Sequence, residues 1–174
     1  MKTYIALLRG INVGGRKKIL MADLKVLFES LGFTEVRTYI QSGNVIFSAS
    51  ESDVHALAIS EAIEKKYEFK VPVLVKTASE VEEILSNCPF SEEKMLKSYF
   101  VLLFEAPSEE IKKAINPEIF PSEEFIITDA CVYLYVSAGM GKAKCTNNFF
   151  ERKLNVNATA RNYRTMVKII SLSR

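Results

Sequence analysis

Three short segments of this sequence combine glycine or small polar residues with cations, a composition that suits the binding of an anion. They are residues 9–18 (RGINVGGRKK), 41–44 (QSGN) and 137–144 (SAGMGKAK). Glycine allows positive φ angles and close backbone approach, so consecutive amides can surround negative charge. The third segment also leads toward a helix, whose N-terminus would attract an anion. Each segment could equally be a plain surface turn, and 41–44 has the composition of a hairpin turn.

The ligand-binding candidates come from these segments and from the end of the chain. They are Arg9, Asn12, Gly14, Gly15, Arg16, Lys17, Gln41, Ser42, Asn44, Gly139, Gly141, Lys142, Lys144, Arg161, Asn162, Arg164 and Lys168. In this hypothesis the cations contact phosphate groups. Arginine suits that task best, because its guanidinium can bind two phosphate oxygens at once.

The run 9–18 matches neither of two common nucleotide-binding loops. Its spacing from Gly10 to Gly15 imitates a phosphate-binding loop, but Arg16 and Lys17 stand where that motif requires Lys followed by Ser or Thr. The run also lacks the G-x-G-x-x-G pattern of dinucleotide-binding folds. We therefore interpret it as a basic glycine loop.

The last helix is expected to begin after Thr159 and to carry a basic face. At about 100° of rotation per residue, its residues separate into two sets. The apolar face is predicted to hold Tyr163, Met166, Val167 and Ile170. The basic face is predicted to hold Arg161, Arg164, Thr165 and Lys168. Such a face could contact a ligand or only water, and cations near a helix C-terminus also stabilise the helix dipole.

The formal net charge of +2 conceals an asymmetry along the 174 residues. Residues 1–48 carry seven Lys or Arg against three Asp or Glu, a net +4. Residues 49–138 carry eight against seventeen, a net −9, and residues 139–174 carry eight against one, a net +7. Basic ends of this kind favour a polyanionic partner such as nucleic acid. The alternative is that oppositely charged segments neutralise one another within the fold.

Patterns for catalysis or metal binding are sparse. The single histidine, His55, is expected to pack beside the inner stripe of a helix, and no Ser/His/Asp or Cys/His set can be assembled around it. The cysteines, Cys88, Cys131 and Cys145, lack C-x-x-C spacing and are expected to be free thiols of a reducing cytoplasm. No metal site and no cofactor are expected, and the question of enzymatic activity stays open.

Hydrophobic periodicity predicts an α+β fold of two ferredoxin-like halves of βαββαβ type in tandem, with antiparallel or mixed sheets and helices packed on them. The first half is predicted to contain strands over 3–8, 36–40, 45–47 and 71–76, a helix near 24–31 and a helix over 53–68 that Ser52 caps. A connecting helix follows, with a capping box of Ser79 and Glu82.

The second half is predicted to repeat this order. It contains strands over 99–104, 125–128 and 132–136, a helix that Ser108 caps and that Asn116-Pro117 ends, and a helix near 147–154 capped at Thr146. We expect one compact domain over 1–174, built of a half over 1–77, a linking helix and loop over 78–97, and a half over 98–174. No apolar run approaches the roughly 20 residues that span a bilayer, so a cytoplasmic protein without membrane contact is expected.

Three strings resemble, in order, a bacterial family catalogued as domain of unknown function 1697. They are YIALLRGINVGG with MADL (residues 4–15 and 21–24), YIQSGNV (39–45) and ATARNYRT (158–165). The resemblance runs from Tyr4 to about Leu172, with Tyr163 where that family usually has Trp after Arg-Asn. It implies a soluble bacterial single-domain α+β protein with ferredoxin-like halves. It implies no established activity, so no catalytic residue is carried over.

Three hypotheses of function follow. The first is a binding protein for a phosphate-bearing ligand, nucleic acid or nucleotide, held by the basic loops and the last helix. The second is an enzyme that acts on a small anionic substrate in a cleft between the halves, where Arg9, Asn44 and Arg161 would converge. The third is an oligomeric scaffold that uses its sheet edges. The sequence assigns no oligomeric state.

Overall fold

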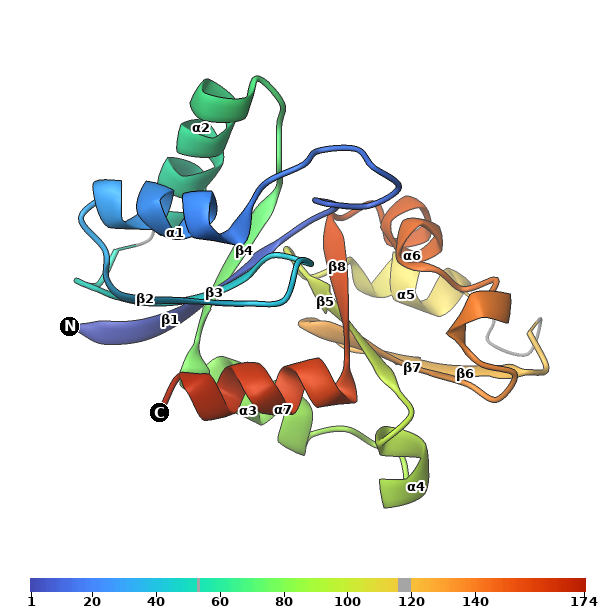
Figure 1. Ribbon diagram of the computed structural model, residues 1–174. Coiled ribbons are helices and arrows are strands. Elements are labelled where there is room, and N and C mark those ends of the chain that lie inside the picture. Colours follow the sequence, from blue (N-terminus) through green and yellow to red (C-terminus); the bar gives the residue numbers. More distant parts are fainter. Residues whose placement is uncertain (53, 116–119) are drawn as a thin grey trace. The chain divides into compact units, whose positions relative to one another are not determined.

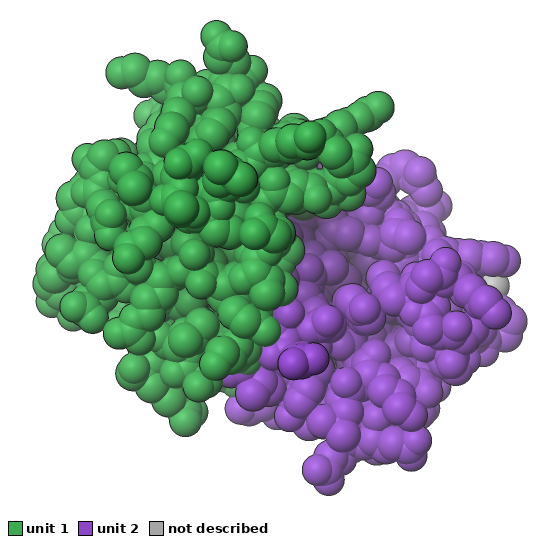
Figure 2. All heavy atoms as spheres, viewed as in Figure 1, with its two compact units in different colours: residues 1–82, 168–174 green, residues 83–167 purple. Residues whose placement is uncertain are grey.

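Two four-stranded antiparallel sheets with helices packed on them form the fold (Figure 1). The structure is a computed structural model that describes residues 1–52, 54–115 and 120–174. Its internal contacts divide the chain into two compact units (Figure 2). Unit 1 comprises Met1–Glu82 together with Lys168–Arg174, and unit 2 comprises Glu83–Val167. The C-terminal residues therefore cluster with the N-terminal unit.

Unit 1 has the predicted βαββαβ order. Its elements are β1 (Lys2–Leu8), α1 (Met21–Ser30), β2 (Thr34–Tyr39), β3 (Asn44–Ala49), α2 (His55–Tyr67) and β4 (Val73–Thr77), followed by α3 (Ala78–Ser86). The strand order is β2-β3-β1-β4, and every neighbouring pair is antiparallel. This order is that of a ferredoxin-like sheet.

Unit 2 repeats the pattern. Its elements are α4 (Glu92–Met95), β5 (Tyr99–Leu103), α5 (Glu109–Ala114), β6 (Glu123–Ile127), β7 (Cys131–Val136), α6 (Asn147–Leu154) and β8 (Ala158–Asn162), and α7 (Tyr163–Leu172) follows β8. The strand order β6-β7-β5-β8 corresponds to that of unit 1. The predicted α+β class with two similar halves is therefore confirmed. Among the residues described, no helix combines the length and the apolar character needed to cross a bilayer.

Alternation along the strands builds each core. In unit 1, Ala6 and Leu8 of β1 face the same cluster as Phe28 of α1 and Ile59 of α2, and all four are fully buried. Figure 1 shows α1 and α2 together on one face of this sheet. In unit 2, Phe150 of α6 packs with strand residues in the same way. Burying one such large side chain contributes about 1.5–3 kcal/mol, so the two clusters hold the helices on their sheets.

The end of the chain differs from the sequence prediction. Residues 158–162 form strand β8, which pairs with β5, and α7 begins only at Tyr163. The prediction of a helix directly after Thr159 was wrong, because the apolar strand β5 offers this segment a full set of backbone partners. The predicted faces of the last helix were wrong at three positions, of which the first, Arg161, lies in β8 at 6% exposure. Thr165 is buried at 5% exposure, whereas Val167 is 40% exposed.

Two predicted helix caps were also misplaced. The capping box of α3 consists of Thr77 and Glu80, whose carboxylate accepts from the Thr77 amide at 2.7 Å. The Glu80 amide donates back to Thr77 Oγ1 at 3.3 Å. The box lies two residues earlier than predicted because α3 starts immediately after β4. Ser52 accepts from the Val54 amide, ahead of α2, and does not cap its first turn.

The two predicted caps of unit 2 are confirmed. Ser108 accepts from the Ile111 amide at the start of α5, and Thr146 accepts from the Phe149 amide at the start of α6. The predicted helix start at residue 53 and the predicted stop at 116–117 lie outside the described residues.

Gly43 closes the β2–β3 turn against β1. Its φ is +81°, and a Cβ there would lie 2.7 Å from Leu8 Cβ and 2.8 Å from Ile11 Cδ1. We predict that Gly43→Ala lowers the free energy of unfolding by about 3 kcal/mol, because it adds overpacking to left-handed strain. Gly32 has a φ of +83° but no atom within 4 Å, so Gly32→Ala should cost only about 1 kcal/mol. Equal losses in chemical denaturation would contradict the close packing of Gly43.

Candidate anion-binding site

The segment between β1 and α1 folds into a small hairpin, residues 12–18, that we name the basic hairpin. The Asn12 amide donates to the Lys17 carbonyl at 3.1 Å, and the Arg16 amide donates to the Val13 carbonyl at 3.0 Å. Gly14 and Gly15 hold the two turn positions with φ angles of +58° and +74°. Positive φ at both positions defines a type I′ turn. The two glycines are therefore required by the turn itself.

Asn12 fixes the basic hairpin to two neighbouring segments. Its Nδ2 donates to the Ile19 carbonyl at 3.0 Å and to the Gln41 carbonyl at 2.8 Å. Its Oδ1 accepts from the Ile19 amide at 2.9 Å. The φ of Asn12 is +56°, a conformation that asparagine tolerates better than most side chains. We name these three bonds the Asn12 clamp, which joins the hairpin to the start of α1 and to the β2–β3 turn.

The β2–β3 turn, residues 40–43, is fixed by hydrogen bonds from Asn44 and from strand β1. Asn44 is fully buried, and its Nδ2 donates to the Tyr39 carbonyl at 2.9 Å and to Ser42 Oγ at 3.1 Å. The Leu8 amide donates to the Gly43 carbonyl at 2.8 Å. The structure thus brings together the two predicted segments 9–18 and 41–44, and the contacts that do so run mostly through backbone carbonyls.

Cations gather on the basic hairpin. Arg16, Lys17 and Lys18 are exposed, and Lys17 Nζ donates to the Lys70 carbonyl at 2.6 Å. That bond brings the backbone of a fourth exposed cationic residue, Lys70, next to the hairpin. Within the described chain, neither Arg16 nor Lys18 forms an ion pair. Arg9 is half-buried at the end of β1, and its amide donates to the Pro72 carbonyl.

The glycine loop of unit 2 is organised around a buried carboxylate. Glu123, at the start of β6 and 4% exposed, accepts from the Lys144 amide at 2.6 Å and from the Cys145 amide at 2.7 Å. Burial acts to raise the pKa of Glu123, but these donating amides hold the pKa below its ordinary value. Two amides of the predicted anion loop thus bind a carboxylate of the chain itself. The side chains of Lys142 and Lys144 are exposed.

Glu123 was missed by sequence reasoning. It lies 21 residues before Lys144 and two residues before the strand predicted over 125–128, so no sequence pattern indicates its role. Gly139 directly precedes a short 3-10 helix, Met140–Lys142, and has a φ of +84°. Gly141 lies within this helix.

The remaining candidates, at the end of the chain, have three different environments. Arg161 lies in β8 at 6% exposure, and its Nη1 donates to Thr159 Oγ1 at 2.7 Å and to the Ala160 carbonyl at 2.9 Å. Asn162 Oδ1 accepts from the Thr165 amide at 2.8 Å and so caps α7. Arg164 and Lys168 are exposed on α7, as predicted. Arg164 belongs to unit 2 and Lys168 to unit 1.

The family model described as protein of unknown function (DUF1697) matches residues 1–133. The chain belongs to this family. A similar solved structure is that of the conserved bacterial protein SP0830 from Streptococcus pneumoniae, with a TM-score of 0.75 and 23% sequence identity over 99% of this chain and 98% of that one. At this identity the likeness shows the fold. No curated protein matches the sequence.

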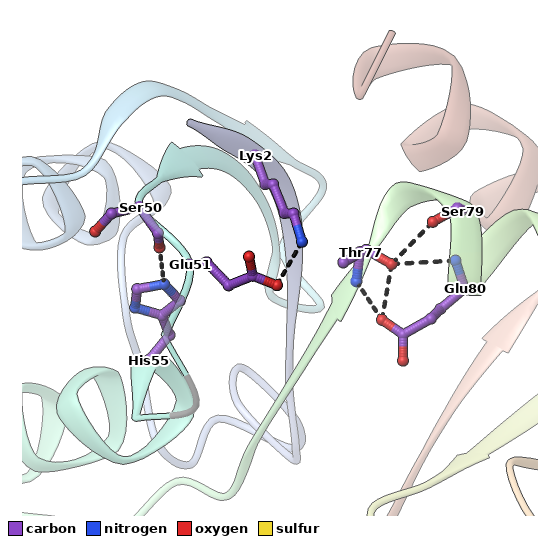
Figure 3. Close-up of polar contacts among 7 residues, drawn as sticks. All are labelled: Lys2, Ser50, Glu51, His55, Thr77, Ser79 and Glu80. Atoms are coloured by element: carbon purple, nitrogen blue, oxygen red, sulfur yellow. Dashed lines mark hydrogen bonds and ion pairs between the residues drawn. The ribbon is translucent and has the colours of Figure 1, made fainter.

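Unit 1 of this DUF1697 member also contains a cavity of about 300 Å³ beside the N-terminus of α2. Its lining residues are Tyr4, Glu51, Ser52, His55, Ala56, Val75, Lys76, Thr77 and Glu80. Figure 3 shows its polar contacts: Lys2 pairs with Glu51, and Thr77 bonds to Glu80. Lys76 Nζ lies 3.3 Å from Glu80 Oε1. Burial acts to raise the pKa of Glu80, but the bonds from Thr77 and the charge of Lys76 lower it. The acids and cations here neutralise one another.

His55 is a buried titratable side chain that lines this cavity. It packs as predicted, edge-on to Tyr4 and Phe33 with ring centroids 5.1 and 5.3 Å away. Its Nε2 lies 2.8 Å from the Ser50 carbonyl oxygen (Figure 3). Because a carbonyl only accepts, Nε2 carries the hydrogen, and Nδ1 of the neutral ring carries the lone pair. No sequence pattern indicates that this histidine lines a cavity.

The thiols of this DUF1697 member are poor nucleophiles. Cys88, Cys131 and Cys145 are free, and burial raises the pKa of each thiol, that of Cys145 to about 12 with a contribution from Glu123. Protonated thiols neither attack nor ligate metals. In residues 1–52, 54–115 and 120–174, no three His, Cys, Asp or Glu side chains gather into a metal-binding group.

Asn12→Gly tests the Asn12 clamp, because glycine accepts the same φ but makes no side-chain bonds. We predict a loss of about 2 kcal/mol in unfolding free energy and faster hydrogen exchange at the Ile19 amide, which loses its acceptor. Asn155 has a similar φ of +55°, and Asn155→Gly should change stability by less than about 0.5 kcal/mol. An unchanged Ile19 exchange rate in Asn12→Gly would contradict the clamp.

Glu123→Gln tests the carboxylate in unit 2. We predict a loss of about 2 kcal/mol at neutral pH, because hydrogen bonds to an ionised acceptor are replaced by weaker ones. The folded pKa of Glu123 is lowered, so its contribution is complete above the unfolded pKa of about 4.3 and disappears as the pH falls through the folded pKa.

The control is Glu124→Gln, whose exposed carboxylate lies 2.6 Å from Lys94 Nζ and should contribute less than about 1 kcal/mol. Urea unfolding of all three proteins against pH measures this. A wild-type advantage over Glu123→Gln that grows in acid would reverse the expected sign.

Proposed function

We propose that this chain is a cytoplasmic protein that binds a phosphate-bearing ligand, nucleic acid or nucleotide, through the basic hairpin of unit 1. The observation that carries the proposal is the Asn12 clamp, which presents Arg16, Lys17 and Lys18 on a fixed, exposed turn. The three free thiols fit the reducing interior of a cell.

Charge supports an anionic ligand at this hairpin. Residues 9–18 contain four cations and no acid. The nearby Lys70, whose carbonyl accepts from Lys17, is itself paired with Glu64 at 3.9 Å and is not counted with them. A cation without an acidic neighbour retains its full attraction for an incoming phosphate. Arg16 adds geometry to charge, since its guanidinium can bind two phosphate oxygens.

Rigidity supports the proposal as well. Ordering a loop on binding costs about 0.5–1.5 kcal/mol for each side chain immobilised, and backbone ordering adds to that cost. In the basic hairpin the backbone is already fixed by the I′ turn and the clamp. The backbone part of this ordering cost is therefore met during folding. Lys142, Lys144, Arg164 and Lys168 are further exposed cations that we propose as electrostatic contacts.

The test is the salt dependence of binding to labelled DNA and RNA by fluorescence anisotropy between about 50 and 200 mM salt. We predict that the triple variant Arg16→Gln, Lys17→Gln, Lys18→Gln binds more weakly and that its log–log salt slope falls by about 2 to 3, because three phosphate contacts are lost.

The control triple, Lys25→Gln, Lys65→Gln, Lys66→Gln, removes the same charge from the helices α1 and α2. It should leave the slope unchanged. A wild-type protein that binds neither nucleic acid nor nucleotide at the lower salt concentration, or two triples with the same effect, would overturn the proposal.

A further inference from the structure

Exposed aliphatic side chains surround the Asn12 clamp. Val13 is 66% exposed, Leu20 68% and Ile40 48%. Val13 follows Asn12 in the chain, Leu20 follows Ile19, and Ile40 precedes Gln41. The clamp bonds Asn12 to Ile19 and to Gln41. Each of the three aliphatic residues is therefore the chain neighbour of a residue of the clamp. Their backbones lie close to the clamp, and we name these three exposed residues the clamp-edge aliphatics.

Ile40 is also held in an unfavourable backbone conformation. Its φ is +48°, a left-handed value that is a true outlier for a β-branched residue. Asparagine or glycine would adopt this conformation at lower cost and would expose no apolar surface. Backbone strain of this kind costs about 1–3 kcal/mol and concentrates at functional positions. An exposed and strained isoleucine beside a cationic turn points to a contact made by its side chain.

We propose that the ligand of the basic hairpin is single-stranded nucleic acid, an inference that rests on the proposed function. Its bases pack on the clamp-edge aliphatics while its phosphates contact Arg16, Lys17 and Lys18. Charge complementarity requires an anionic occupant, and the aliphatic side chains require one that also offers apolar faces. A duplex presents phosphates outward but keeps its bases stacked inside. A single strand presents both at once, and its unstacked bases lie against side chains in many protein complexes.

The chemistry separates this ligand from a free nucleotide. Several cations on the basic hairpin, together with exposed aliphatic residues on it and beside the clamp, fit a chain of alternating phosphates and bases. A mononucleotide binds best in an enclosed pocket that buries most of its surface, whereas Arg16, Lys17 and Lys18 are all exposed. We therefore expect affinity to grow with strand length.

The experiment compares a labelled single strand of about 16 nucleotides with the duplex of the same sequence. The variant is Val13→Thr, Leu20→Asn, Ile40→Asn, which keeps every charge and places asparagine at a left-handed position that it tolerates. We expect wild type to prefer the single strand, and the variant to lose about tenfold in single-strand affinity with an unchanged salt slope.

The matched control is Val26→Thr, Val54→Asn, Leu57→Gln, three aliphatic residues of unit 1 that are 58%, 59% and 59% exposed. It should bind like wild type. Equal affinity for single strand and duplex, or an aliphatic variant that binds like the control, overturns this inference and leaves the proposed function standing. Binding to vesicles of anionic phospholipid in preference to the single strand overturns it in favour of a lipid surface. Absence of salt-dependent binding to any of the nucleic acids overturns the proposed function itself.

Discussion

The bonds of one asparagine side chain organise the β1–α1 end of unit 1. Asn12 joins the basic hairpin, the start of α1 and the β2–β3 turn through three hydrogen bonds of 2.8 to 3.0 Å. Few side chains could replace it, because the position needs a left-handed backbone, a donor pair and an acceptor together. In the neighbouring β2–β3 turn, Gly43 packs on Leu8 without room for a Cβ. The exposed cations are therefore built on a closely packed base.

The two units stabilise their glycine loops with different charges. Unit 1 uses the neutral carboxamide of Asn12, and unit 2 uses the ionised carboxylate of Glu123. A carboxylate makes the stronger bonds to backbone amides, but it also places a negative charge beside the loop. A neutral clamp leaves the full positive charge of its loop available to a ligand. For this reason we propose the hairpin of unit 1, rather than the loop of unit 2, as the main anion site.

Much of the fold could be predicted because its strands and helices have strong periodicity. The two βαββαβ halves, both hairpins and the caps at Ser108 and Thr146 followed from local patterns. Strand β8 could not, since Ala158–Asn162 has no run of branched residues and is a strand because β5 pairs with it. The faces of α7 were misplaced because the buried stripe of this helix includes Thr165 and Ile169 and excludes Val167, a packing choice that the sequence pattern does not show.

The candidate site shows the same limit at shorter range. Glycines and cations mark residues 9–18 as a basic loop, but the partner of Asn12 is a carbonyl 29 residues away, and carbonyls carry no sequence signal. The uneven distribution of charge, which favours an anionic partner, could be read from the sequence. Which of the two glycine loops is the better candidate could not be predicted, because this depends on the hydrogen bond from the Lys144 amide to Glu123, 21 residues earlier in the chain.

Stability alone does not account for the surface around the clamp. A chain optimised only for folding would place a residue without β-branching at the left-handed position of Ile40 and polar side chains at Val13 and Leu20. These changes are local, since the three side chains are 48–68% exposed. The molecule instead has strain, apolar exposure and uncompensated charge within a few residues of a rigid clamp. The ligand that we propose, which carries both phosphate and apolar faces, would account for all three features with one contact surface.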